Sequence, residues 1–301
     1  MPVRGDHARP CANTRTHSLT RRTVIPTSKP LDISMSISRP EGTKHLTQAQ
    51  VAQFVNDGFV IVPGLVDPDR VRAGLKELKN KTGIVPDESK TWPTDKNGMH
   101  VTQEGIAIDR TMCISPKLKA IVRELAGPAV TNEPGLSPIL RFPQPGPKQF
   151  EPGGAHIDGT RQGNGLTVYP THFLLLVMAY LTDTDAHDGA FTVWPGSPRQ
   201  VFSWAYTNNI DLGEKWRTTG STGAPDIPLN DPIPVVARAG DVAICHYLMV
   251  HASSANRGDH VRVGFHGWLR ATPEYQYVPK TGPPQTDWTP LDWILRTDNL
   301  Q

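Results

Sequence analysis

The first part of the chain shows the spacing of amphipathic helices. Between Thr47 and Asp57 the apolar residues fall on one stripe, and Gly58 follows as a stop signal. Two later segments have a capping residue, then proline, then apolar residues at helical spacing, and finally glycine. The pattern predicts three helices and one short strand, at residues 47–57, 67–83, 115–127 and 59–62, respectively.

From Ser137 onward the pattern changes to short apolar runs separated by Pro, Gly, Asn and Asp, which is typical of strands joined by turns. Such regular spacing predicts a mainly β fold, either a sandwich or a jelly roll, with the helices packed outside it. Residues 200–232 carry little periodicity and are predicted to form a long loop, of the kind that often serves as a lid. Strands are predicted at 139–142, 155–158, 173–181, 190–194, 235–237, 242–246 and 261–270.

The last predicted strand has two distinct faces, because side chains alternate along a strand. Val261, Val263, Phe265 and Leu269 point one way, and the opposite face carries Arg262, Gly264, His266 and Trp268. If Arg262 faces the interior, His266 and Trp268 line the wall of the same pocket.

Composition favours one large domain with an N-terminal tail in a chain of 301 residues. The 29 prolines and 26 glycines indicate many turns, and the longest apolar stretch, residues 173–181, is too short to cross a bilayer. Three scattered cysteines do not form a disulfide framework. We therefore expect a soluble, intracellular protein without a membrane partner; no pattern indicates an oligomeric state.

The net charge of +2 conceals an uneven distribution. Residues 1–40 carry seven Lys or Arg and two Asp, which leaves about −3 for the remainder and gives that part no basic character to attract nucleic acid. Residues 1–44 are therefore interpreted as a basic extension. It is either disordered, or a transit peptide that would direct the protein to an organelle instead of the cytoplasm, or sequence upstream of an initiator at Met35.

Candidate metal ligands occur in two separate segments. His156 and Asp158 flank Ile157 after a glycine pair, and His251 follows much later in the chain. Two imidazoles and one carboxylate form the ligand set that binds non-haem Fe(II) and leaves positions open for substrate and O2. Arg262 lies eleven residues after His251, and its planar guanidinium suits a carboxylate, which suggests a 2-oxo acid cosubstrate.

The order of these motifs resembles the Fe(II)/2-oxoglutarate dioxygenases, and the flanking segments resemble the phytanoyl-CoA dioxygenase family in particular. The resemblance runs from about Leu46 to about Arg270 and includes residues 46–64, 180–183 and 193–197. It implies one catalytic domain, residues 45–301, with a double-stranded β-helix core of the jelly-roll, cupin-like type. Such an enzyme uses Fe(II), 2-oxoglutarate and O2 to hydroxylate or otherwise oxidise a C–H bond of a small molecule, with release of succinate and CO2.

The resemblance also implies residue roles. His156, Asp158 and His251 would bind the metal, and Arg262 with Ser253 would bind 2-oxoglutarate. Asp158 favours oxygenation, since related halogenases carry a small residue there, whereas Ile157 replaces a polar amide of the phytanoyl-CoA enzyme and leaves an acyl-CoA substrate open. Substrate contacts are predicted for Arg141, Trp194, His266 and Trp268.

Two other functions are compatible with parts of this pattern. A cupin-like hydrolase or isomerase would use the same ligands for Zn or Mn, but it would need no clamp for an oxo acid such as Arg262. A non-catalytic relative would bind a ligand without turnover, and the intact set of ligands argues against it.

Overall fold

The computed structural model describes residues 45–94, 101–102, 113–127, 135–158, 173–208 and 224–270. The predicted extension, residues 1–44, lies outside them. Within the described residues the fold is mainly β with flanking helices, as the sequence predicts.

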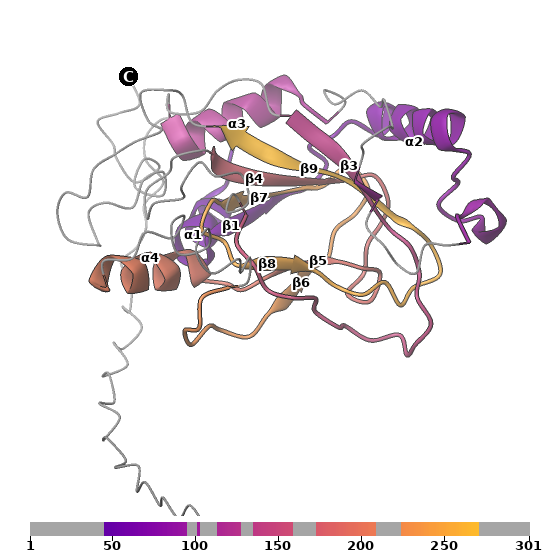
Figure 1. The fold of residues 1–301 in the computed structure, drawn as a ribbon. Coiled ribbons are helices and arrows are strands. Elements are labelled where there is room, and N and C mark those ends of the chain that lie inside the picture. Colours follow the sequence, from indigo (N-terminus) through magenta and orange to yellow (C-terminus); the bar gives the residue numbers. More distant parts are fainter. Residues whose placement is uncertain are drawn as a thin grey trace, which may run out of the picture. The chain divides into compact units, whose positions relative to one another are not determined.

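Two antiparallel sheets lie one above the other at the centre of the described part of the chain (Figure 1). The larger sheet has six strands, in the order β1 (Phe59–Val62), β7 (Val242–His246), β4 (Phe173–Tyr180), β9 (Arg262–Arg270), β3 (Gly135–Arg141) and β2 (Val101–Thr102). The smaller sheet has three strands, in the order β6 (Ile233–Val235), β5 (Phe191–Val193) and β8 (His251–Ser253).

Helix α1 (Gln48–Asp57) begins and ends where its capping residues predict. Thr47 and Gln50 form a reciprocal capping box, and Gly58 ends the helix with φ of 81°, a conformation that glycine adopts without strain. The helix buries Val51, Phe54 and Val55 and leads directly into β1.

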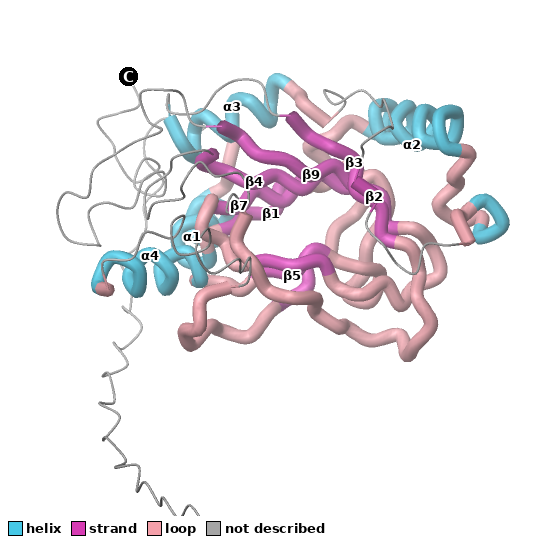
Figure 2. Tube along the Cα trace, in the orientation of Figure 1, coloured by secondary structure: helices cyan, strands magenta, loops and turns pink. Residues whose placement is uncertain are grey.

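The next two long helices follow the same rules. Helix α2 (Pro68–Thr82) starts after Asp67, and α3 (Pro116–Ala126) starts after Ser115; both caps accept backbone N–H groups. Figure 2 shows α2 and α3 beside the larger sheet, whereas long loop segments surround the smaller one. A single 3-10 turn, η1 (Ser89–Thr91), follows α2.

Two predictions for the local structure are wrong. Residues 200–207 belong to a helix, α4 (Ser197–Thr207), which buries Val201 and Phe202, so the segment predicted as a continuous loop begins with ordered structure. Residues 155–158 form no strand and make only an isolated β-bridge at His156. The remaining predicted strands are present with small shifts at their ends.

The register of the larger sheet sets which side chains meet across it. Arg262 lies opposite Arg141 on β3, and His266 lies opposite Met178 on β4. Gly264 has no room for a side chain, because a Cβ there would clash with the Ala179 carbonyl oxygen and the Met178 side chain. Across the sheet, the polar side chains of β9 therefore face both polar and apolar neighbours: Arg141 lies opposite Arg262, and Met178 lies opposite His266.

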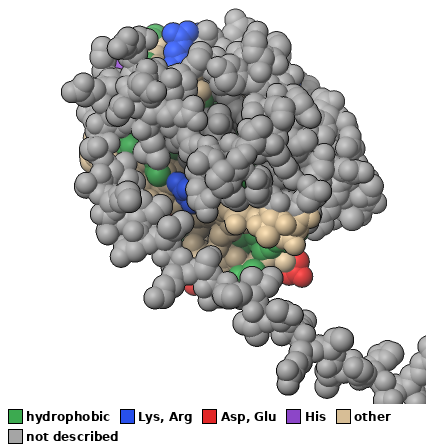
Figure 3. All heavy atoms as spheres, turned by 90° about the vertical axis from the view of Figure 1, so that its left-hand side faces the viewer, with side chains coloured by type: hydrophobic (Ala, Val, Ile, Leu, Met, Phe, Trp, Pro, Cys, Tyr) green, Lys and Arg blue, Asp and Glu red, His purple; other side chains and the backbone are tan. Residues whose placement is uncertain are grey.

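No helix in the described ranges is long and apolar enough to cross a membrane. On the face shown in Figure 3, the visible side chains of described Lys and Arg residues form small separate groups.

Candidate metal centre

Backbone pairing brings the two candidate histidine ligands together. The His156 N–H donates to the His251 carbonyl at 3.0 Å, and the His251 N–H donates to the His156 carbonyl at 2.9 Å. The approach depends on Gly153, since a Cβ at that position would clash with the carbonyl oxygen of Ser253 on β8. Gly154 has open space instead. One member of the glycine pair thus allows close contact with β8.

The segment before His251 is held by a buried serine. The Ser197 hydroxyl accepts the Val250 N–H at 3.0 Å and lies 3.4 Å from the Met249 sulfur. His251 itself pairs with Val193 of β5. The N-terminus of α4 and the smaller sheet therefore fix the same ligand.

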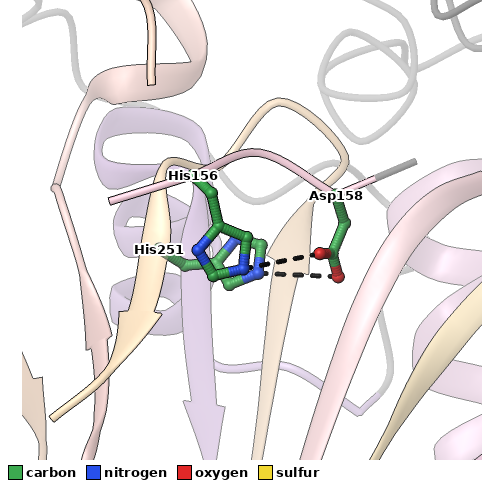
Figure 4. Close-up of side chains that lie close together, drawn as sticks. All are labelled: His156, Asp158 and His251. Atoms are coloured by element: carbon green, nitrogen blue, oxygen red, sulfur yellow. Dashed lines mark ion pairs between the residues drawn. The ribbon is translucent and has the colours of Figure 1, made fainter. Parts of the chain in front are cut away.

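The three candidate ligands converge (Figure 4). One ligand atom from each of His156, Asp158 and His251 lies within 4.8 Å of the other two. The Nε2 atom of His156 is 3.6 Å from Asp158 Oδ1, and the Nε2 atom of His251 is 3.5 Å from Asp158 Oδ2. Both imidazoles turn the same edge toward the carboxylate, as expected of side chains that can share one metal ion.

Backbone carbonyls select the nitrogen that each imidazole presents. The Nδ1 atom of His156 lies 3.1 Å from the Gly154 carbonyl oxygen, and that of His251 lies 2.9 Å from the Met249 carbonyl oxygen. A proton on Nδ1 satisfies each carbonyl and leaves the Nε2 lone pair directed at Asp158. The tautomer required of a metal ligand is therefore the one that the backbone favours.

Opposing influences set the charges of the centre. Burial favours the neutral form of Asp158, but His251 and His266 outweigh it and hold the pKa of the carboxyl well below its usual range. Burial likewise disfavours the charged form of His251, yet the Asp158 carboxylate and the Met249 carbonyl raise its pKa. Burial and the neighbouring His251 lower the pKa of His156. The centre thus retains its carboxylate anion and at least one readily deprotonated imidazole.

Two residues predicted to line the pocket contact Asp158. The Trp268 indole N–H donates to Asp158 Oδ2 at 2.9 Å, and the Nε2 atom of His266 lies 3.5 Å from the same oxygen. Both side chains project from the face of β9 that the alternation predicts to be internal. They lie close enough to orient the carboxylate.

Arg262 is fully buried in this interior. Its Nη1 atom lies 3.7 Å from the Met178 sulfur, whereas Nε and Nη2 have no hydrogen-bond partner among the described residues. Burial lowers the pKa of its guanidinium to about 10, and the charge of Arg141 contributes to the shift. Sequence reasoning missed Met178 and Tyr180 as its neighbours, although their alternation along β4 places them on one face.

The other candidate residues lie at different places. Ser253 is two residues beyond His251 on β8, so the two side chains share a face of that strand. Arg141 donates from Nη2 to the Ser254 carbonyl at 2.9 Å. The Trp194 side chain is half-buried and packs against the core, and the Trp194 backbone N–H donates to the Val250 carbonyl oxygen at 3.0 Å. The described contacts do not join the Trp194 side chain to the metal ligands.

Two histidines and a carboxylate that converge, and a fully buried arginine that forms no ion pair with another described residue, lie in a fold of two antiparallel sheets; this combination is typical of the non-haem iron enzymes that use a 2-oxo acid. The model of the family Phytanoyl-CoA dioxygenase (PhyH) matches residues 54–264, and the chain belongs to this family. The protein is accordingly an oxidoreductase of the iron- and 2-oxoglutarate-dependent dioxygenase type.

The chain is similar to several solved structures. EvdO2 from Micromonospora carbonacea var. aurantiaca, complexed with 2-oxoglutarate, matches with a TM-score of 0.50 and 13% identity, over 82% of this chain and 98% of that one. The non-heme alpha ketoglutarate dependent epimerase SnoN from nogalamycin biosynthesis matches with a TM-score of 0.49 and 22% identity, over 81% and 94%. A comparison with curated proteins gave no match.

Proposed function

We propose that the protein hydroxylates a C–H bond of a small-molecule substrate at an Fe(II) centre held by His156, Asp158 and His251. The convergence of these three ligands, and the backbone carbonyls that favour a proton on Nδ1 and a free Nε2 lone pair in both imidazoles, support this assignment. Asp158 supports oxygenation over halogenation, because its carboxylate fills the coordination position that a halide would need.

Arg262 would bind the distal carboxylate of 2-oxoglutarate, with help from Ser253. The observation that carries this part is the unpaired edge of the guanidinium: Nε and Nη2 are both buried without a partner among the described residues. These two nitrogens form the side of an arginine that donates two parallel hydrogen bonds to one carboxylate. A buried cation without such a partner is costly, and a bound carboxylate would remove that cost.

The residues of the chain orient and shield the reacting groups. When bound, iron and 2-oxoglutarate supply the oxidising chemistry, in which O2 is consumed and succinate and CO2 are released. Asp158 stays ionised between its neighbours, and the full burial of Arg262 keeps water from its guanidinium. His266, Trp268, Trp194 and Arg141 remain the candidates for substrate contacts.

We further propose that the two sheets form a double-stranded β-helix of the jelly-roll type. The path of the chain supports this topology, because β7, β8 and β9 alternate between the larger and the smaller sheet. The hydrogen-bonded neighbours agree with it: β4 pairs with β7 and β9, while β5 pairs with β6 and β8. In this arrangement the metal ligands lie between the two sheets.

An anaerobic titration tests the proposed function. Fe(II) and 2-oxoglutarate together should give the wild-type protein a visible charge-transfer band, and admission of O2 should then yield succinate. Asp158→Ala should lose the band, and Arg262→Ala should require far more 2-oxoglutarate to develop it. Absence of the band from the wild type, or an unchanged titration in both variants, would contradict the proposal.

A further inference from the structure

A second arginine lies beside the proposed cosubstrate clamp. Arg141 at the end of β3 and Arg262 at the start of β9 are directly opposite each other in the antiparallel pair. Side chains of opposite residues rise from the same face of a sheet, a few ångströms apart at their Cβ atoms. Two positive charges in this relation repel each other unless an anion lies near both.

The polar atoms of Arg141 are only partly satisfied. Nη2 donates to the Ser254 carbonyl at 2.9 Å, but Nε is buried and has no hydrogen-bond partner among the described residues. None of the ion pairs formed within the described ranges includes Arg141 or Arg262. Burial lowers the pKa of Arg141 as it does that of Arg262. Both guanidinium groups thus have unmet capacity to donate to an anion.

We propose that Arg141 and Arg262 form one anion site that holds the distal carboxylate of the 2-oxo acid between two guanidinium groups. The inference rests on the proposed function and extends it, because it assigns Arg141 to the cosubstrate instead of the substrate. The Ser254 carbonyl that anchors Arg141 directly follows Ser253, the residue expected to help hold 2-oxoglutarate. Arg141 is thereby held toward the same end of β8.

The chemistry of a carboxylate fits this pair. Its two oxygens can accept about four hydrogen bonds, so the edge of Arg262 occupies two and Nε of Arg141 finds a third. The negative charge also offsets the repulsion between the two cations. A 2-oxo acid without a distal carboxylate would offer neither these hydrogen-bond acceptors nor this negative charge to the arginine pair.

The test compares two 2-oxo acids of equal length, 2-oxoglutarate and 2-oxopentanoate, in anaerobic titrations of the Fe(II)-loaded full-length protein. The readout is the charge-transfer band, so no turnover is needed. Arg141→Met should weaken 2-oxoglutarate binding about tenfold or more, in line with the loss of hydrogen bonds to a charged group, and leave 2-oxopentanoate binding nearly unchanged. Arg141→Lys keeps the positive charge and should therefore lose less affinity for 2-oxoglutarate than Arg141→Met.

A matched control removes another arginine that binds a backbone carbonyl. Arg199 donates from Nε and Nη2 to the Val55 carbonyl, at 3.2 and 3.0 Å. Arg199→Met should leave the ratio of the two affinities as in the wild type. If Arg141→Met weakens both acids equally, its role is structural and the proposal is wrong.

A double-mutant cycle adds a second criterion. If both arginines hold one carboxylate, the loss of 2-oxoglutarate affinity in Arg141→Met/Arg262→Met should be smaller than the combined losses of the single variants. If the effects of the two substitutions add, the shared site is wrong. It is also wrong if Arg141→Met and Arg141→Lys both keep the wild-type affinity for 2-oxoglutarate; Arg141 would then remain only a candidate for a substrate contact. A wild type that gives no band with 2-oxoglutarate would instead refute the proposed function itself.

Discussion

Asp158 has the most crowded surroundings of the three candidate ligands. One of its oxygens accepts the Trp268 indole N–H and lies 3.5 Å from Nε2 of both His251 and His266. A carboxylate that is held on one oxygen presents the other in a fixed direction, which favours binding of a metal at that side. We therefore expect Trp268 to help place the ligand, in addition to the substrate contact predicted for it.

Replacement of Trp268 by Phe should lower the affinity for Fe(II) by about tenfold or more, because the indole N–H donor to Asp158 is lost, while a smaller aromatic ring remains in its place. Competition with a chromophoric chelator would measure this affinity without turnover. Trp92→Phe is the matched control, since the Trp92 N–H donates to the Val85 carbonyl at 3.0 Å instead of to a metal ligand. Equal metal affinity in Trp268→Phe and the wild type would exclude the positioning role.

Asp57 is a charged residue in an unfavourable place. It ends α1, where the helix dipole disfavours a negative charge, and burial raises its pKa. An acid whose pKa is raised by folding destabilises the native state at pH values above that pKa, and the penalty disappears below the unfolded value of about 3.9.

Asp57→Asn should therefore stabilise the protein at pH 7 by about 0.5–1 kcal/mol. Urea denaturation at several pH values would show the difference between variant and wild type shrinking as the pH falls toward 4. A gain that is independent of pH would show that the charge is not its cause.

At the scale of elements, the glycine before the first candidate histidine decides whether two segments can pair. Gly153 passes so close to β8 that a side chain would meet the Ser253 carbonyl, while neighbouring Gly154 faces open space. Gly153→Ala should disrupt the bridge between His156 and His251, reduce metal affinity, and cost about 1–3 kcal/mol of stability.

Gly154→Ala is the control for this substitution, because it adds the same methyl group one residue later without a clash. Thermal unfolding and chelator competition on both variants measure the two effects. Similar behaviour of the two variants would show that close packing at Gly153 does not matter.

The helices were predictable because their signals are local. Thr47 with Gln50, and Asp67 with Pro68, fix the helix ends through short-range contacts. The structure of the segment around His156 was not predictable in this way. A few apolar residues suggest a strand there, but the segment forms only one β-bridge, to β8. Helix α4 begins with Ser197 and Pro198, but the weak periodicity of the following residues hides this helix start in the sequence.

The candidate site was predictable in part, for a related reason. Residue types and order identify His156, Asp158 and His251 as possible ligands, and the structure brings them together. The hydrogen bond from Trp268 to Asp158 and the opposition of Arg141 to Arg262 depend on long-range strand register. Alternation shows which face a side chain takes, but not which atom it meets on another strand.

At the scale of the whole molecule, the candidate site draws on both sheets. His251 lies on the smaller sheet, Arg262 on the larger one, and His156 and Asp158 on the segment paired with β8. A metal ion and a 2-oxo acid bound at these residues would connect the two sheets in addition to the existing contacts between them, such as the hydrogen bond from Arg141 on β3 to the Ser254 carbonyl after β8. Binding should therefore stabilise the native state as a whole.

Mn(II) together with 2-oxoglutarate at about one hundred times its dissociation constant should stabilise the wild type by about 2.7 kcal/mol beyond Mn(II) alone. Arg262→Met should lose most of this increment but keep the response to Mn(II), whereas Asp158→Ala should lose both. Thermal denaturation followed by circular dichroism measures these shifts. An increment retained in Arg262→Met would place the 2-oxo acid elsewhere.

The bridge between His156 and His251 has a consequence for how such a protein can change. The distance between the two imidazoles is set by main-chain hydrogen bonds, which any amino acid except proline can make. Side chains around the histidines can therefore be exchanged to admit a differently shaped substrate without moving the ligands apart. Redesign of this enzyme for new molecules should leave residues 153–158 and 249–253 intact and vary the pocket wall.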